Sequence, residues 1–329
     1  MSYKPMVSVV IPTYNRADST IKAIHSVLSQ TYKQYEVIVI DDGSTDGSDV
    51  PVQRFVQQQD GNGRRMFWIP QDNQGPSAAR NEGIRRSHGE LIAFLDSDDI
   101  WHSEKLEWQI KAFDVLGYDC GACCTDTRYT NNLGVDQSTF ALLGRQYEKT
   151  IGIEHNAVKL LAKSFCGFFV SSLMARAEVV REVGGFNTAI HFAEDRDLFF
   201  RLCLASDLCY VNKQLVISDR SKTPSGSDCR PWDKVEVRLE GLRCMYHSWL
   251  EEESGLPETV RKTVVGELRA NHAAWANWHL DNRRYTDARR EVTEAIGLGV
   301  TPKMAAKFAL TWIAPELARK LSGRPGAYL

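Results

Sequence analysis

The chain has 329 residues, of which 43% are hydrophobic and 25% charged, and its net charge is −2. These values are typical of a globular protein of about two domains and exclude a disordered or low-complexity chain. The balance of 40 basic against 42 acidic residues gives no support to a nucleic-acid partner. Because no apolar run is long enough to span a bilayer, we expect a cytoplasmic protein, soluble or peripheral to the inner face of the cell membrane.

The first hundred residues alternate strand-like and helix-like segments. Short apolar runs predict strands at 7–11, 36–40, 66–69 and 91–95. Helical spacing of apolar residues, or entry through a proline, predicts helices at 17–30, 51–59 and 76–87. Strands that are apolar almost throughout and alternate with helices indicate an α/β fold. We expect a Rossmann-like, mostly parallel sheet flanked by helices.

The following residues are less regular, and residues 118–150 mix strand and turn signals. Helices are expected at 104–116, 158–164, 177–183 and 194–205, and strands at 168–174, 208–211 and 214–217. The turn-rich segment 219–231 predicts a loop or lid. Beyond it the pattern predicts helices at 233–253, 258–281 and 286–296, and therefore an all-α C-terminal region.

Three polar clusters come directly after predicted strands. They are Pro12–Arg16 (PTYNR), Asp41–Gly47 (DDGSTDG) and Asp96–Asp99 (DSDD). Ligands of open α/β sheets bind outside the carboxyl ends of the strands, so we expect the three clusters to converge on one crevice.

The carboxylates of Asp96 and Asp98 leave an extended chain on the same face. They would repel each other unless they share a cation, and Mg²⁺ or Mn²⁺ prefers such oxygen ligands. A metal held there could bridge a diphosphate and stabilise its charge as it leaves. The alternative is a solvated acidic turn.

These clusters, taken with later motifs, resemble the family 2 glycosyltransferases of the type-A, nucleotide-sugar-dependent fold. The matching segments are Val9–Arg16 (VVIPTYNR), Asp41–Asp46 (DDGSTD), Asn73–Asn81 (NQGPSAARN), Leu95–Asp99 (LDSDD), Gly184–Asn187 (GGFN) and Glu194–Asp195. They follow the order of the family and cover about residues 5–220.

The resemblance implies a role for each residue of the donor site. Pro12, Thr13 and Tyr14 fall where the family binds the nucleotide base, with the Tyr14 ring able to stack on it. Asp42 falls where a carboxylate accepts a hydrogen bond from the uracil imide. Arg80 lies near the donor sugar and diphosphate.

The DxD pair, Asp96 and Asp98, would hold the Mg²⁺ or Mn²⁺ ion, with Asp98 the more direct ligand, and Asp96 also belongs to the donor site. Relatives often carry Arg-x-His in a loop over the diphosphate. This chain has Arg220-Ser-Lys222 instead. The two basic side chains could pair with phosphate oxygens, or they could be ordinary solvated surface.

Asp195 matches the catalytic base of the family. Glu194 is its rival, because successive residues on a helix point about 100° apart and only one should face the crevice. The alternative is a purely structural role, in which Asp195 caps the helix.

The resemblance thus implies an inverting glycosyltransferase that moves a sugar from a nucleotide sugar, with UDP-sugar the best guess, to a hydroxyl of a glycan or lipid-linked acceptor. Cell-surface polysaccharide or glycan biosynthesis is the expected setting. Residues 1–220 would form the catalytic domain, with a nucleotide-sugar half (1–100) and an acceptor half (101–220), and 221–329 the helical region.

Two other function classes stay open. A sugar nucleotidyltransferase would be expected to carry a Gly-rich loop with basic residues after the first strand, where this chain has PTYNR. A non-catalytic nucleotide-sugar-binding or scaffold protein would not need the DxD pair or the Glu194–Asp195 pair.

The segment 302–329 carries five basic residues and one acidic residue among bulky apolar ones. Such a segment can lie on an anionic membrane surface. The alternative is a final helix packed on the protein.

Overall fold

The computed structural model describes residues 5–61, 65–131, 134–163, 168–221, 234–252, 255–299 and 302–321. The chain divides into two compact units. The first comprises Met1–Ala157, Cys166–Thr188 and Glu194–Pro224, and the second Val158–Phe165, Ala189–Ala193 and Ser225–Leu329.

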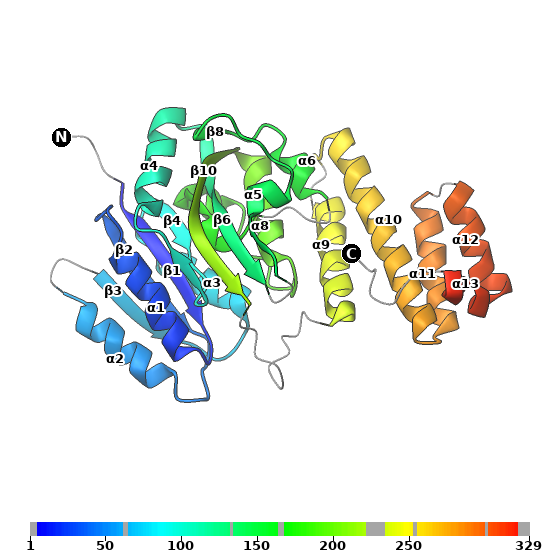
Figure 1. The fold of residues 1–329 in the computed structure, drawn as a ribbon, viewed down its shortest axis with the longest axis horizontal. Helices are drawn as coiled ribbons and strands as arrows, with labels where there is room; N and C mark the ends of the chain where they lie inside the picture. The colour runs from blue at the N-terminus through cyan, green and yellow to red at the C-terminus, as the bar shows by residue number, and fades with distance from the viewer. Residues whose placement is uncertain are drawn as a thin grey trace. The chain divides into compact units, whose positions relative to one another are not determined.

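The first unit is built on a ten-stranded sheet of order β3-β2-β1-β4-β9-β6-β10-β5, with β7 paired to β6 and β8 to β10 (Figure 1). Six strands run in one direction: β1 (Val7–Thr13), β2 (Tyr35–Asp41), β3 (Arg65–Pro70), β4 (Leu91–Phe94), β6 (Cys120–Asn131) and β10 (Asp207–Arg220). Four three-residue strands run against them: β5 (Asp99–Trp101), β7 (Asp136–Ser138), β8 (Ile151–Ile153) and β9 (Met174–Arg176). The predicted mostly parallel sheet is therefore confirmed.

Helices cover both faces of the sheet. On one face α1 (Ala17–Leu28), α2 (Asp49–Gln59) and α4 (Lys105–Leu116) pack on alternate β-strand residues such as Val9 and Val37. On the other face α3 (Pro76–Arg86) packs Ala79 against Ile38 and Ile40. Period-two alternation along β2 thus supplies both cores. The short α7 (Ala177–Glu182) lies beside α3, and α8 (Glu194–Ala205) beside α7.

Helix α3 approaches the sheet closely at Gly83. A Cβ added there would lie 2.2 Å from Val10 Cγ1, so only glycine fits at this depth.

The elements differ from the predicted ones mainly between residues 118 and 220. Residues 120–131 form one long strand, β6. Residues 120–127 of this strand are buried, although they include Thr and Asp. The strand expected at 168–174 is instead a 3-10 turn at Val170–Ser172 followed by β9. The two strands expected at 208–217 are one, β10, with irregular pairing between Val211 and Val216. The remaining short helices there are α5 (Thr139–Leu142) and α6 (Ala157–Leu161).

The second unit contains a set of helices, as the sequence predicts: α9 (Val235–Glu252), α10 (Glu258–Asp281), α11 (Tyr285–Gly297), α12 (Pro302–Ile313) and α13 (Pro315–Leu321) (Figure 1). Its buried polar centre joins three of them, because Glu291 accepts from His272 Nδ1 at 2.7 Å and from Arg243 at 3.2 Å. Among the described residues, no helix has both the length and the apolar character that crossing a membrane requires.

Candidate active site

The carboxyl ends of β1, β2 and β4 meet at one edge of the sheet, where all three polar clusters lie. The loop after β1 is tied to the loop after β2. Asn15 N donates to Ser44 Oγ at 2.9 Å, and Asn15 Oδ1 accepts from Thr45 N at 2.8 Å. Asn15 itself adopts a left-handed backbone (φ 51°), which asparagine tolerates better than most residues. The loops therefore form one connected rim.

The three residues expected to bind the base differ in exposure. Pro12 and Thr13 are buried in β1, and the Thr13 hydroxyl pairs with Thr20 Oγ1 at 2.6 Å. Tyr14, with 43% of its surface exposed, presents its ring to solvent at the strand end. Of the three, Tyr14 is the one whose side chain is open to a ligand.

Asp42 is buried and organises the neighbouring loop. Its carboxylate accepts from Gln71 Nε2 at 2.8 Å, Gln74 N at 2.9 Å and Gly75 N at 2.8 Å. Gly75 immediately precedes α3. A carboxylate has about four acceptor positions. Two are engaged at the start of α3 and one by the Gln71 side chain, so about one is left for a ligand.

Asp96, Asp98 and Asp99 form an acidic cluster after β4. One carboxylate oxygen of each lies within 4.8 Å of the others. The Ser171 hydroxyl bonds to two residues of the cluster: it donates to Asp99 Oδ2 at 2.6 Å and accepts from Asp96 N at 3.0 Å. Burial raises the pKa of Asp99 to about 7. Three carboxylates at this spacing are ligands of the kind that Mg²⁺ or Mn²⁺ takes, so the residues fit a divalent cation.

Three arginines neutralise this cluster in part. Arg16 Nη1 lies 2.7 Å from Asp98 Oδ2, and Arg220 Nη1 contacts the same oxygen. Arg220 Nη2 also lies 3.3 Å from Asp99. Burial alone would lower the pKa of Arg220, but the negative charges of the three aspartates outweigh it and raise that pKa above its usual range.

Arg80 bridges the acidic cluster to α8. Its side chain is only 5% exposed, and it donates to Asp96 at 2.7 Å and to Glu194 at 3.1 Å. Burial opposes its charge, but these two carboxylates overcome that effect and raise the pKa of Arg80. The guanidinium also lies over the Phe186 ring, 5.1 Å from its centroid. Arg80 therefore holds Asp96 of the acidic cluster and Glu194 of α8 on either side of one guanidinium.

Glu194 and Asp195 differ in their surroundings. Glu194 is bound by Arg80, whereas Asp195 accepts a hydrogen bond from the Arg196 main-chain N–H at 2.7 Å. Burial and the negative charge of Glu194 raise the pKa of Asp195 to about 7, against the opposing effects of that N–H and of Arg80. This pKa allows Asp195 to exchange a proton near neutral pH.

The turn before α8 has a structural explanation. The side chain of Asn81 exchanges two hydrogen bonds of 2.8 Å with the main chain of Phe186. Gly185 has φ 68°, and a Cβ there would lie 2.6 Å from Asn81 Oδ1. The GGF turn and the ARN motif are therefore a single contact that places Arg80 and Phe186 together.

The structure brings together residues that sequence reasoning left out: Arg16, Asp99 and Ser171. Arg16 and Asp99 belong to the PTYNR and DSDD clusters, so their position beside the chosen residues was a usable signal. Ser171 lies in a segment without a motif, and nothing in the sequence points to it. Lys222 and the rest of 222–233, where most of the predicted lid falls, lie outside the described residues.

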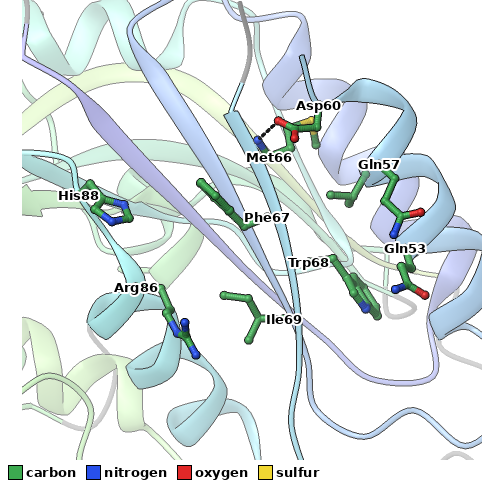
Figure 2. A pocket seen from close by; sticks show the side chains of 10 residues that line it. Gln53, Gln57, Asp60, Met66, Phe67, Trp68, Ile69, Arg86 and His88 are labelled. Atoms are coloured by element: carbon green, nitrogen blue, oxygen red, sulfur yellow. Dashed lines mark hydrogen bonds between the residues drawn. The ribbon is translucent and has the colours of Figure 1, made fainter.

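A separate cavity of about 340 Å³ lies along strand β3 (Figure 2). Phe67 and Trp68 extend from opposite faces of the strand, beside Arg86 on one side and Gln53 on the other. The cavity shares no residue with the acidic cluster or its arginines.

Comparison with known proteins gives a family match. The model of "Glycosyl transferase family 2" matches residues 8–182, just over half the chain. The putative teichuronic acid biosynthesis glycosyltransferase TuaG of Bacillus subtilis is 38% identical over 125 residues, which is 36% of this chain and 48% of TuaG. The chain spans less than half the length of the first four curated relatives that it matches.

Solved structures share the fold at low sequence identity. S. aureus TarS 1-349 in complex with UDP-GlcNAc superposes with a TM-score of 0.69 at 17% identity, covering 96% of this chain and 90% of that one. The mannosyltransferase PcManGT from Pyrobaculum calidifontis, in complex with GDP-Man and Mn²⁺, gives 0.59 at 19% identity, covering 98% and 84%.

Proposed function

The chain belongs to glycosyl transferase family 2, and from that premise we propose that it transfers a sugar from a UDP-sugar to a hydroxyl acceptor with inversion at the anomeric carbon. The observation that carries the proposal is the pair of contacts of Arg80, which joins Asp96 of the acidic cluster to Glu194 of α8. TarS and PcManGT, which share the fold, were solved with a nucleotide sugar.

The donor would lie across the rim of the sheet. Tyr14 would stack on the base above Pro12 and Thr13, and Asp42 would use its remaining acceptor position for the uracil imide. Arg80 and Arg220 would face the diphosphate, since both are charged and partly buried beside the acidic cluster.

Asp96 and Asp98 would hold a Mg²⁺ or Mn²⁺ ion, with Asp99 in the same cluster. When bound, the ion would supply positive charge that stabilises the departing diphosphate. PcManGT, which shares the fold, was solved with Mn²⁺.

Asp195 would act as the general base. Its carboxylate would take the proton of the acceptor hydroxyl as that oxygen attacks the anomeric carbon, while the bond to the nucleoside diphosphate breaks on the opposite face. Glu194, held by Arg80, would position the neighbouring groups. The closeness of the pKa of Asp195 to neutrality supports its role as the base.

We propose a glycan or lipid-linked acceptor, in cell-surface polysaccharide biosynthesis; the name of TuaG, a teichuronic acid biosynthesis glycosyltransferase, agrees with such a setting. Residues 1–220 would form the catalytic domain, with 1–100 serving the nucleotide sugar and 101–220 the acceptor. Residues 221–329 would form the helical C-terminal region.

The C-terminal segment is proposed to touch an anionic membrane. Trp312, Ile313 and Leu317 are 52%, 81% and 48% exposed on α12 and α13. The residues from 302 to 329 include five basic residues and one acidic residue, a net charge of +4. Apolar side chains beside positive charge suit the headgroup region of anionic lipids.

The decisive experiment measures release of nucleoside diphosphate from a panel of UDP- and GDP-sugars with Mn²⁺ and no acceptor. Slow release from one UDP-sugar is expected. Asp98→Asn should abolish metal-dependent release, because it removes a charged ligand. Asp114→Asn, an exposed aspartate of α4, is the matched control and should leave release unchanged. No release from any nucleotide sugar, or full activity in excess EDTA, would contradict the donor or the metal role respectively.

A further inference from the structure

Arg16 is the most exposed of the three arginines at the acidic cluster and binds fewer carboxylates than the other two. Its side chain is 36% exposed, against 5% for Arg80 and 19% for Arg220. Arg80 and Arg220 each bind two carboxylates. Among the described residues, Arg16 forms an ion pair with Asp98 alone. The Arg16 guanidinium can therefore leave its partner at the lowest cost.

The main chain around Arg16 is fixed, although its side chain is open. On one side Asn15 is held by Ser44 and Thr45, and on the other Ala17 N donates to Ser48 Oγ at 3.2 Å. The Arg16 side chain can therefore change its rotamer while its main chain stays fixed. Tyr14, whose ring is exposed, belongs to the same loop.

The charges around Asp98 favour such a movement when ligands arrive. One oxygen of Asp98 accepts from both Arg16 and Arg220, which repel each other. Among the described residues, the ion pairs at this site join four carboxylates (Asp96, Asp98, Asp99, Glu194) to three guanidinium groups. A divalent cation at this cluster would compete with Arg16 for Asp98, while a diphosphate would offer the displaced guanidinium new acceptor oxygens.

We propose that Arg16 exchanges partners during the binding of the donor. Without the donor it neutralises Asp98; with the donor it releases Asp98 and binds the diphosphate. Arg16 is then a donor-binding residue and also a competitor of the metal ion. This inference rests on the proposed function, since it requires a nucleoside diphosphate and a divalent cation at the site.

The test measures two affinities of the full chain by calorimetry: that of Mn²⁺ alone and that of UDP in EDTA. Arg16→Ala should bind Mn²⁺ about three- to thirtyfold more tightly, because a competing positive charge is gone. The same variant should bind UDP roughly 10–100-fold more weakly, as expected when a charge-assisted hydrogen bond is lost. A static positive charge would also affect a cation and an anion with opposite sign, but Arg16→Lys would then restore both affinities to those of the wild type, which would overturn the exchange.

Two controls make the result specific. Arg85→Ala removes an exposed arginine that pairs with Glu82 in α3, and it should change neither affinity. Arg16→Lys keeps the charge but not the two-pronged donor, so it should fall between the wild type and Arg16→Ala. Unchanged affinities in Arg16→Ala, or changes of the same sign, would overturn the exchange while leaving the proposed function intact. A wild-type chain that binds neither Mn²⁺ nor UDP would contradict both.

Discussion

At the scale of single residues, the site depends on which carboxylates are neutralised and which are not. Arg80 binds Glu194 and leaves its neighbour Asp195 with a main-chain hydrogen bond. Two adjacent acids are thereby given different environments, and environment decides which of two carboxylates exchanges protons. The following two predictions test that difference.

Asp195→Asn should lower turnover by roughly 10²–10⁴-fold, the usual contribution of a general base. Donor affinity should stay near that of the wild type, because the Asp195 carboxylate bonds to the Arg196 main chain and, among the described residues, to no side chain of the acidic cluster. The measurement is steady-state transfer together with calorimetric donor binding. Glu194→Gln is the companion variant. If it were inactive while Asp195→Asn lost tenfold or less, the base would be Glu194.

The pH dependence should follow the raised pKa of Asp195. A base with a pKa of about 7 is ionised above that pH and protonated below it, so kcat/KM should fall as the pH decreases through about 7. At pH 6 roughly a tenth of the plateau should remain. The residual activity of Asp195→Asn should lack this limb.

The control for the pH profile is donor binding over the same range. Burial also raises the pKa of Asp99 to about 7, and its protonation would alter binding at the acidic cluster. A limb that appears in the donor dissociation constant and not in turnover would assign the titration to Asp99.

At the scale of elements, the site is carried by α3 and α8, whose starting points are fixed by turns and close contacts. Gly83 lets α3 lie against β1, so the helix sits at the depth that Arg80 needs.

Gly83→Ala should destabilise the protein by about 1–3 kcal/mol, the usual cost of overpacking, because the added Cβ would lie 2.2 Å from Val10 Cγ1. Urea unfolding measures this change. The matched variant is Gly266→Ala in α10, where the nearest atom is the flexible end of Arg269 at 4.0 Å. There the better helix propensity of alanine should stabilise by up to about 1 kcal/mol. Equal effects of the two substitutions would contradict the packing argument.

Elements and motifs with local signals could be predicted from the sequence, and contacts between distant segments could not. The strands up to residue 95 are apolar runs bounded by turns, so their positions follow from periodicity. The length of β6 could not be predicted, because its buried residues after Cys124 are Thr and Asp, which carry no clear strand pattern. The pairing of Arg16 with Asp98 spans 82 residues, and that of Arg80 with Glu194 spans 114. Only the folded sheet brings such partners together.

At the scale of the whole molecule, the question is what the helical unit adds to the sheet unit. Its own core contains the buried aromatic side chains of Tyr246 and Trp249 as well as alanines such as Ala276, and the hydrogen bond between His272 and Glu291 lies inside it. Its last two helices keep Trp312, Ile313 and Leu317 exposed.

Removal of residues 302–329 should shift the protein from vesicles containing anionic phosphatidylglycerol to the soluble fraction in sedimentation assays. Trp312→Ser with Ile313→Ser should do the same to a smaller extent, since it removes apolar area and keeps the charge. Binding of the full chain should weaken as salt rises, because the electrostatic part is screened. Equal sedimentation of the full and shortened chains at low salt would refute the membrane contact.

The hydrogen bonds of Asp42 have a consequence for how the two ends of a donor would influence each other. Its carboxylate holds Gln74 N and Gly75 N at the entrance to α3, and α3 carries Arg80. A ligand group that bonds to Asp42 would draw on the same oxygens that anchor the helix. Base recognition and diphosphate recognition would then be thermodynamically linked, so each would change the affinity for the other by the same factor. An analogue that lacks the base would therefore differ in affinity by an amount that its own missing contacts do not account for.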